Sequence, residues 1–128
     1  MSKICVVVVS GNLERLQMAA MVTSVAAVSG HETLVFFSMN ALPYFIKGSS
    51  EKAPVEGEMG RLILEKNVPE FKMLFEQSVE LGDAKIYPCS MAMDVLGVEQ
   101  GDLETYLGEA TGLTKFLDDA KDSQVWTF

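Results

Sequence analysis

The sequence contains few of the residues that most often build metal centres and disulfide frameworks. It has one histidine and two cysteines among 128 residues, and the two cysteines, Cys5 and Cys89, lie far apart. No metal-ligand spacing such as Cys-x-x-Cys is present, and two distant cysteines do not make a disulfide framework. We therefore expect free thiols, no metal site and no cofactor.

Positive charge and long apolar runs are also scarce. Ten Lys and Arg residues stand against 18 Asp and Glu residues, which gives a formal net charge of −8 at pH 7. Without a basic stripe, we expect neither nucleic acid nor an acidic membrane surface as a partner. No segment approaches the roughly 20 apolar residues that span a bilayer. Met1–Lys3 leads straight into a strand-like run without a leader pattern, so we expect a cytoplasmic protein.

Segments with the pattern of strands alternate with segments that have the period of helices. This alternation predicts parallel strands joined by helical crossovers, and hence a single α/β domain over residues 1–128, built as a three-layer sandwich with a mostly parallel sheet. The predicted strands are Ile4–Val9, Thr33–Phe37, Ala84–Pro88, Thr105–Leu107 and Val125–Phe128. The predicted helices are Leu13–Ser29, Asn40–Ile46, Pro69–Gly82, Ser90–Gly97 and Thr111–Lys121.

Three predicted turns meet at the carboxyl edge of this sheet, where ligands bind in open α/β folds. They are Ser10-Gly11-Asn12, Ser38-Met39-Asn40 and Pro88-Cys89-Ser90. Asn12 and Asn40 could contact a ligand, cap helices, or do both, and these alternatives stay open. The candidate ligand-binding residues are Gly11, Asn12, Asn40, Ser90 and Met91.

Cys89 is the candidate catalytic residue. Pro88 should end the third strand, which leaves Cys89 just before a helix whose first-turn N–H groups and partial positive charge favour a thiolate. The alternative is a buried, inert thiol that packs as a small hydrophobic side chain. His31 precedes the second strand and should lie at the opposite edge of the sheet, which argues against a Cys–His pair. Cys5 is expected in the core.

The run Tyr87-Pro88-Cys89-Ser90-Met91-Ala92-Met93-Asp94-Val95-Leu96-Gly97-Val98 resembles the cysteine motif of the DsrE/DsrF-like sulfurtransferases, in particular a branch with a Cys-x-Met-x-Met-Asp pattern. Val9–Asn12, Phe36-Phe37, Asn67–Pro69 and Glu80–Gly82 also resemble family segments. The resemblance implies a five-stranded, Rossmann- or flavodoxin-like parallel α/β fold, assembly into homo-oligomers, and a cysteine that carries sulfane sulfur as a persulfide. That cysteine would be Cys89.

The function that these observations predict is a sulfur carrier or sulfurtransferase. Cys89 would take sulfur from a donor protein or a small sulfane-sulfur compound and pass it to an acceptor thiol, with no metal or second thiol required. The alternative from another class is a non-enzymatic subunit of an oligomer in which the cysteine is inert. A thiol peroxidase is a third reading, for which no resolving cysteine is apparent.

Two further segments carry expectations. The polar run Lys47–Glu58 should be a mobile loop that starts near the crevice and could act as a lid. The middle of the first helix, Met18–Val28, is apolar almost all round, which predicts that a second subunit covers one face of it. Ala20 and Ala27 are candidate contact positions for that subunit.

Overall fold

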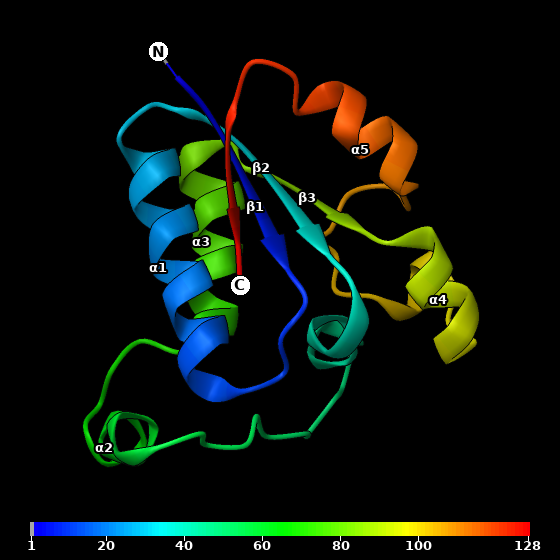
Figure 1. The fold of residues 1–128 in the computed structure, drawn as a ribbon. Coiled ribbons are helices and arrows are strands. Elements are labelled where there is room, and N and C mark those ends of the chain that lie inside the picture. The colour runs from blue at the N-terminus through cyan, green and yellow to red at the C-terminus, as the bar shows by residue number, and fades with distance from the viewer. Residues whose placement is uncertain (1) are drawn as a thin grey trace.

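The computed structural model describes residues 2–128, which fold around a parallel sheet of four strands (Figure 1). The strand order is β3-β2-β1-β4, and all three pairings are parallel. The strands are β1 (Lys3–Val8), β2 (Glu32–Phe37), β3 (Lys85–Pro88) and β4 (Gln124–Thr127). The helices are α1 (Leu13–Val28), α2 (Glu58–Glu65), α3 (Phe71–Gly82), α4 (Ser90–Leu96) and α5 (Leu113–Asp119), with 3-10 turns η1 (Met39–Phe45) and η2 (Gln100–Asp102).

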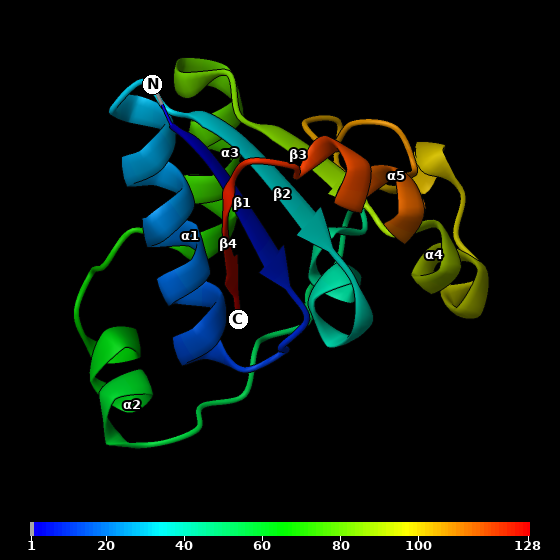
Figure 2. The ribbon, with the colours of Figure 1, turned by 45° about the horizontal axis from the view of Figure 1, so that its top comes forward.

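Helices cover both faces of the sheet, because successive side chains of a strand point to opposite faces. On β2, Phe37 packs against Phe75 of α3, with ring centroids 4.9 Å apart. The neighbouring Phe36 packs on the other face against Phe116 of α5 at 4.8 Å. Figures 1 and 2 show α1 and α3 together on one side of the strands and α5 on the other. The α/β sandwich is thus confirmed.

The fifth strand is a wrong prediction, since Thr105–Leu107 forms a turn. The chain from Gly108 to Thr111 nevertheless follows the free edge of β3. The Gly108 N–H donates to the Ile86 carbonyl, and the Thr111 N–H donates to the Pro88 carbonyl at 2.9 Å. Only one bridge forms, between Cys89 and Thr111. An irregular segment therefore occupies the place that a fifth strand would take.

Helix α1 presents two different faces. Ala20 and Ala27 are buried, and a Cβ added at Gly82 of α3 would lie 2.6 Å from the Ala27 Cβ. Ala27 allows close approach of α3, and both alanines are buried within the chain itself, so the expectation that these two positions face another subunit was wrong. The exposed apolar residues of α1 lie elsewhere on the helix. They are Met18, Met21, Val25 and Val28.

Helix α2 was not predicted; it begins where the polar run Lys47–Glu58 ends and forms only about two turns. Its N-terminus is held from outside: the Glu14 carboxylate of α1 accepts N–H bonds from Glu56 and from Gly57, the latter at 2.7 Å. These bonds lower the pKa of the Glu14 carboxyl. A Cβ at Gly60 would lie 2.5 Å from the Glu14 carboxyl carbon, so a larger residue there would displace the Glu14 side chain.

The segment between η1 and α2 is polar, as predicted, and is anchored at both ends. The Lys47 N–H donates to the Asp102 carbonyl at 2.8 Å, and the Leu13 N–H donates to the Pro54 carbonyl at 2.9 Å. From η1 the segment runs toward α2, away from α4 and the Cys89 end of β3 (Figures 1 and 2). Its direction gives no support to a lid over Cys89.

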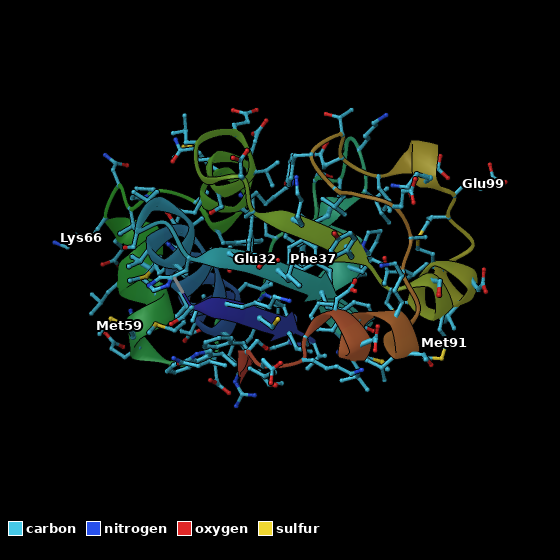
Figure 3. All side chains as sticks on the ribbon, turned by 90° about the horizontal axis from the view of Figure 1, so that it is seen from above. Glu32, Phe37, Met59, Lys66, Met91 and Glu99 are labelled. Carbon is cyan, nitrogen blue, oxygen red and sulfur yellow. The ribbon has the colours of Figure 1, made fainter. Side chains whose placement is uncertain are left out.

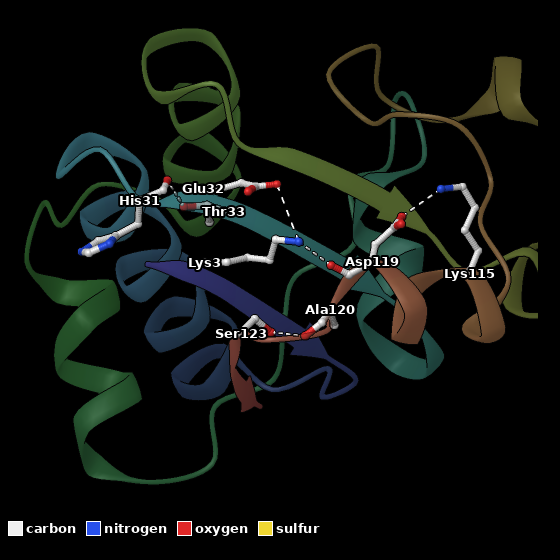
Figure 4. A network of polar contacts seen from close by, with 8 residues as sticks. All are labelled: Lys3, His31, Glu32, Thr33, Lys115, Asp119, Ala120 and Ser123. Carbon is white, nitrogen blue, oxygen red and sulfur yellow. Dashed lines mark hydrogen bonds and ion pairs between the residues drawn. The ribbon is translucent and has the colours of Figure 1, made fainter. Parts of the chain in front are cut away.

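Polar contacts tie α5 to the amino edge of the sheet (Figure 4). The Lys3 ammonium donates to the Asp119 carbonyl at 2.7 Å and lies 3.9 Å from the Glu32 carboxylate. His31 lies at this same edge, one residue before β2, and its carbonyl accepts from the Thr33 hydroxyl at 2.9 Å. The predicted separation of His31 from Cys89 is therefore confirmed.

Candidate functional site

The carboxyl ends of β1, β2 and β3 are level with one another. In the register, Val8 pairs with Phe37 and Phe37 pairs with Pro88. The turns after these strands therefore start side by side, as the sequence predicts. However, β2 lies between β1 and β3, and neighbouring strands are about 4.8 Å apart. The turn after β1 is consequently one strand further from Cys89 than the turn after β2.

Cys89 lies at the junction of β3 and α4, where it is the N-cap residue of the helix. Its N–H donates to the Phe37 carbonyl at 2.9 Å, and its carbonyl accepts from the Met93 N–H at 3.0 Å. The backbone is thus fixed to β2 on one side and to α4 on the other. The side chain makes no capping hydrogen bond, and the residue is 5% exposed.

The irregular segment along the β3 edge lies directly beside the Cys89 backbone, and we call it the cover segment. Thr111 is buried and spans the cysteine: its N–H donates to the Pro88 carbonyl, and its carbonyl accepts from the Ser90 N–H at 3.1 Å. The exposed Gln100 braces this segment. Its side-chain amide donates to the Gly108 carbonyl at 2.8 Å and accepts from the Ala110 N–H at 2.9 Å. Side-chain bonds from one surface residue therefore help to hold the cover in place.

Ser90 and Met91, which directly follow Cys89, differ in exposure. Ser90 is half-buried, and a Cβ added at Gly112 would lie 3.8 Å from its hydroxyl. Met91 is 56% exposed. Figure 3 shows Met91 at the periphery of the molecule, beside α4 and α5. A thioether is therefore available to a molecule that approaches this end of the sheet.

Gly11, after β1, and Asn40, after β2, contact each other at the same edge of the sheet as Cys89. A Cβ at Gly11 would lie 3.0 Å from both the Cβ and the carbonyl oxygen of Asn40, so a larger residue would displace this contact. The Asn40 N–H donates to the Val9 carbonyl at 3.1 Å, and the Tyr44 hydroxyl donates to the Gly11 carbonyl at 2.9 Å. Burial raises the pKa of the Tyr44 phenol, which keeps the hydroxyl a donor.

The two asparagines have different roles. The Asn12 side chain accepts from the Arg15 N–H at 2.9 Å and caps α1. Asn40 caps nothing, since the N-cap of η1 is Ser38, and its side chain is exposed. The capping reading is thus confirmed for Asn12 alone.

Sequence reasoning missed two residues at this edge. The sequence predicts Thr111 as the start of a helix, and its place beside Cys89 has no signal in the local sequence. Met39 adopts a left-handed conformation with φ of 50° and is exposed directly after Ser38. A methionine in this region of φ is uncommon, because its side chain crowds the backbone. Neither feature can be deduced from residue type.

The second thiol, Cys5, lies inside the sheet, as predicted. It is fully buried in β1, between β2 and β4. Burial raises the pKa of the Cys5 thiol, and the nearby Ser123 hydroxyl and Lys3 ammonium act in the opposite direction. Cys5 is therefore a core residue.

Within residues 2–128, no group of three or more His, Cys, Asp or Glu side chains is placed to hold a metal ion. Over the same residues, no helix has the length and apolarity needed to cross a membrane.

Comparison with known proteins identifies the family of this chain. A model of the DsrE/DsrF/DrsH-like family matches residues 52–128, which is more than half of the chain and includes Cys89. The chain belongs to this family. Gly11, Asn12 and Asn40 lie outside the matched residues. No curated protein matches the chain.

Two solved structures share the fold over their whole length. The ychN protein from E. coli is 17% identical with a TM-score of 0.69, and the match covers 100% of both chains. MTH1491 from Methanobacterium thermoautotrophicum, a protein of unknown function, is 8% identical with a TM-score of 0.72, again over 100% of both chains. At these identities the likeness establishes the parallel α/β fold of this family member and no more.

Proposed function

We propose that this DsrE-like chain is a cytoplasmic sulfur carrier that holds sulfane sulfur as a persulfide on Cys89, and that it belongs to the Cys-x-Met-x-Met-Asp branch. The observation that carries the proposal is the position of Cys89: a cysteine at the carboxyl edge of a parallel sheet, at the N-cap of α4, beside an exposed Met91. Membership in a family whose proteins commonly relay sulfur supports this assignment.

The transfer needs one thiolate and no external oxidant. The Cys89 thiolate attacks the outer sulfur of a donor persulfide, a new S–S bond forms, and the donor leaves as a thiolate. An acceptor thiolate then attacks the outer sulfur on Cys89, and the Cys89 thiolate leaves. Each step breaks one S–S bond and forms one, so the neutral sulfur atom moves without net oxidation or reduction.

The cover must open for either step, because Cys89 is only 5% exposed. The covering segment meets the edge strand β3 at a few backbone bonds and one isolated bridge. Opening it would leave the order of the sheet intact. We propose that Ser90 and Met91 then flank the outer sulfur and that Gly11 and Asn40 shape the more distant wall. Asn12 supports this edge of the sheet by capping α1.

The experiment is a loading and unloading cycle, read out by intact-mass spectrometry. Exposure to polysulfide should add sulfur atoms to the protein, and an added small-molecule thiol should remove them and appear as its own persulfide. Heavier protein that the thiol cannot unload would show a dead-end adduct rather than a carrier. A protein that gains no sulfur would contradict the proposal.

The low exposure of Cys89 favours one alternative, a non-enzymatic subunit with an inert cysteine. In that case the fold serves only to assemble an oligomer. The loading cycle separates the two functions, since an inert cysteine gains no sulfur from polysulfide under native conditions and gains it only after denaturation.

We further propose that the chain forms a homo-oligomer through the outer face of α1. Met18, Met21, Val25 and Val28 are exposed there, and residues 16–30 contain no Asp, Glu, Lys or Arg. A chain of net charge −8 repels its own copies elsewhere, so an uncharged apolar face is the surface on which they can meet.

The test compares two exposed helical positions by light scattering. Val25 is 66% exposed on α1, and Leu81 is 77% exposed on α3. Val25→Glu should lower the molar mass of the assembly, and Leu81→Glu should leave it unchanged. A monomeric wild-type chain would overturn the proposal.

A further inference from the structure

A hollow of about 580 Å³ lies at the far end of the molecule from Cys89. It is enclosed by the start of α1, the segment before α2, α2 itself and the first turn of α3. Figure 3 shows Lys66, which lines it, at one end of the molecule and Met91 at the other. The volume falls within the roughly 300–1,000 Å³ typical of small-molecule sites.

The inner wall of this hollow is apolar and built from several elements. Leu13 of α1 and Phe71 of α3 are buried, and Ile63 of α2 is half-buried beside them. Gln17, 4% exposed, also lines the hollow, and its amide donates to the Pro69 carbonyl at 2.9 Å. This bond fixes the turn before α3 to α1. The hollow is thus a formed part of the fold.

Three cations surround this apolar interior. Lys52, Lys66 and Lys72 line the hollow, together with the acids Glu51 and Glu70. Among residues 2–128, none of the three lysines is in a salt bridge. A chain with ten Lys and Arg residues against 18 acids therefore places three unpaired lysines around one apolar space. Such an arrangement complements an anion that carries an apolar group.

Another hollow lies along α1 and β4, and it differs from the hollow beside α2 in its charge. It measures about 400 Å³ and is lined by residues such as Met21, Val25 and Trp126, with no Asp, Glu, Lys or Arg. It is also the more open of the two. Charge therefore distinguishes the hollow beside α2 as the one suited to an anionic ligand.

We propose that the hollow beside α2 binds a small amphipathic carboxylate, of the kind represented by a medium-chain fatty acid. Its chain lies against Leu13, Ile63 and Phe71, and its carboxylate lies among Lys52, Lys66 and Lys72. This site is separate from the sulfur chemistry proposed for Cys89 and does not depend on it.

The test is an NMR titration of the amide spectrum with three probes: decanoate below its micelle concentration, decyltrimethylammonium, and acetate. Decanoate should shift the signals of Gln17, Ala53 and Phe71. The other two probes should bind at least about tenfold more weakly, because one lacks the negative charge and the other lacks the chain. Equal binding of decyltrimethylammonium, or no binding of decanoate at millimolar concentration, would overturn the proposal.

Charge variants supply the matched control. The double variant Lys66→Glu/Lys72→Glu should weaken decanoate binding about tenfold, since loss of each exposed ion pair weakens binding about two- to fivefold. Lys85→Glu, an equal change at an exposed lysine of β3, should have no effect. If both proteins bind alike, or if the shifts gather at Val25 and Trp126, the assignment of the hollow is wrong.

Two more variants test whether the hollow can be blocked and whether it is independent of Cys89. Ala53→Trp should fill the hollow and abolish decanoate binding while the rest of the amide spectrum stays dispersed. Cys89→Ser should bind decanoate as the wild type does, so that failure of sulfur loading and failure of this site are seen separately. A fall in molar mass on adding decanoate would show that another copy of the chain occupies the hollow instead.

Discussion

The two cysteines of this chain are both buried, yet different structures cover them. Cys5 lies in the middle of β1 with a paired strand on each side, and its removal from water is a property of the whole sheet. Cys89 lies past the end of an edge strand, beside an irregular segment held by a few bonds. Exposure alone, 0% against 5%, hardly separates them. The difference between them is how much structure must open before a reagent reaches the sulfur.

Alkylation should show the largest difference between the two thiols. Iodoacetamide should modify Cys89 at least about a hundredfold faster than Cys5, because exposing Cys5 requires the sheet to open and exposing Cys89 requires only its cover to move. Peptide mapping after timed quenching measures both rates. In denaturant the two should react alike. Equal rates in the native protein would remove the distinction.

Substitution with serine should change the free energy of unfolding by different amounts at the two cysteine positions. Cys5→Ser puts a hydroxyl into an apolar strand and should lower the free energy of unfolding by roughly 1–3 kcal/mol. Cys89→Ser should change it by less than about 1 kcal/mol, because serine is a favoured N-cap residue. Urea unfolding measures both. A larger loss at Cys89 would mean that its side chain is a packing residue.

Loosening the cover should affect one thiol only. Gln100→Ala removes the side-chain bonds to Gly108 and Ala110 and should raise the alkylation rate of Cys89 about five- to thirtyfold, since each of the two bonds is worth roughly 0.5–1 kcal/mol. Gln77→Ala, at an exposed glutamine of α3, is the matched control and should change nothing. An unchanged rate in Gln100→Ala would show that this brace does not govern access.

Low pH should weaken the attachment of α2 and leave both cysteines unaffected. This is the smallest effect that we expect. The backbone bonds to Glu14 depress its folded-state pKa. Its contribution to stability is therefore complete above the ordinary carboxyl pKa of about 4.3 and is lost as the pH falls through the lower folded value. Proteolysis with an acid-stable protease should then cut residues 47–66 faster. Glu14→Gln should show this sensitivity already at neutral pH, and a resistant variant would contradict the role of Glu14.

The sequence predicts the order of elements well where one residue type controls the local structure. The β-branched run at the start predicts β1, Pro88 predicts the end of β3, and Asn12 predicts the start of α1, and the structure agrees in each case. The absent fifth strand shows the limit, because Gly108 to Thr111 follows β3 through backbone contacts that no periodicity records. The exposed side of α1 was misplaced for a similar reason: alanines suit a subunit interface and the contact with α3 equally well.

At the candidate site, the sequence locates Cys89 but not its surroundings. The turn residues meet at the carboxyl edge, yet β2 lies between Cys89 and the turn that carries Gly11. Thr111 and Gln100, which control access, come from a segment over ten residues further along the chain. Their roles depend on tertiary backbone bonds, which is why residue type gave no warning of them.

The most direct test of the account is the intact mass of three proteins after polysulfide treatment under native conditions. Wild type and Cys5→Ala should each gain sulfur that a thiol reductant removes, and Cys89→Ser should gain none. Sulfur on Cys89→Ser, or its loss in Cys5→Ala with the fold intact, would place the reactive thiol at Cys5 and contradict the account.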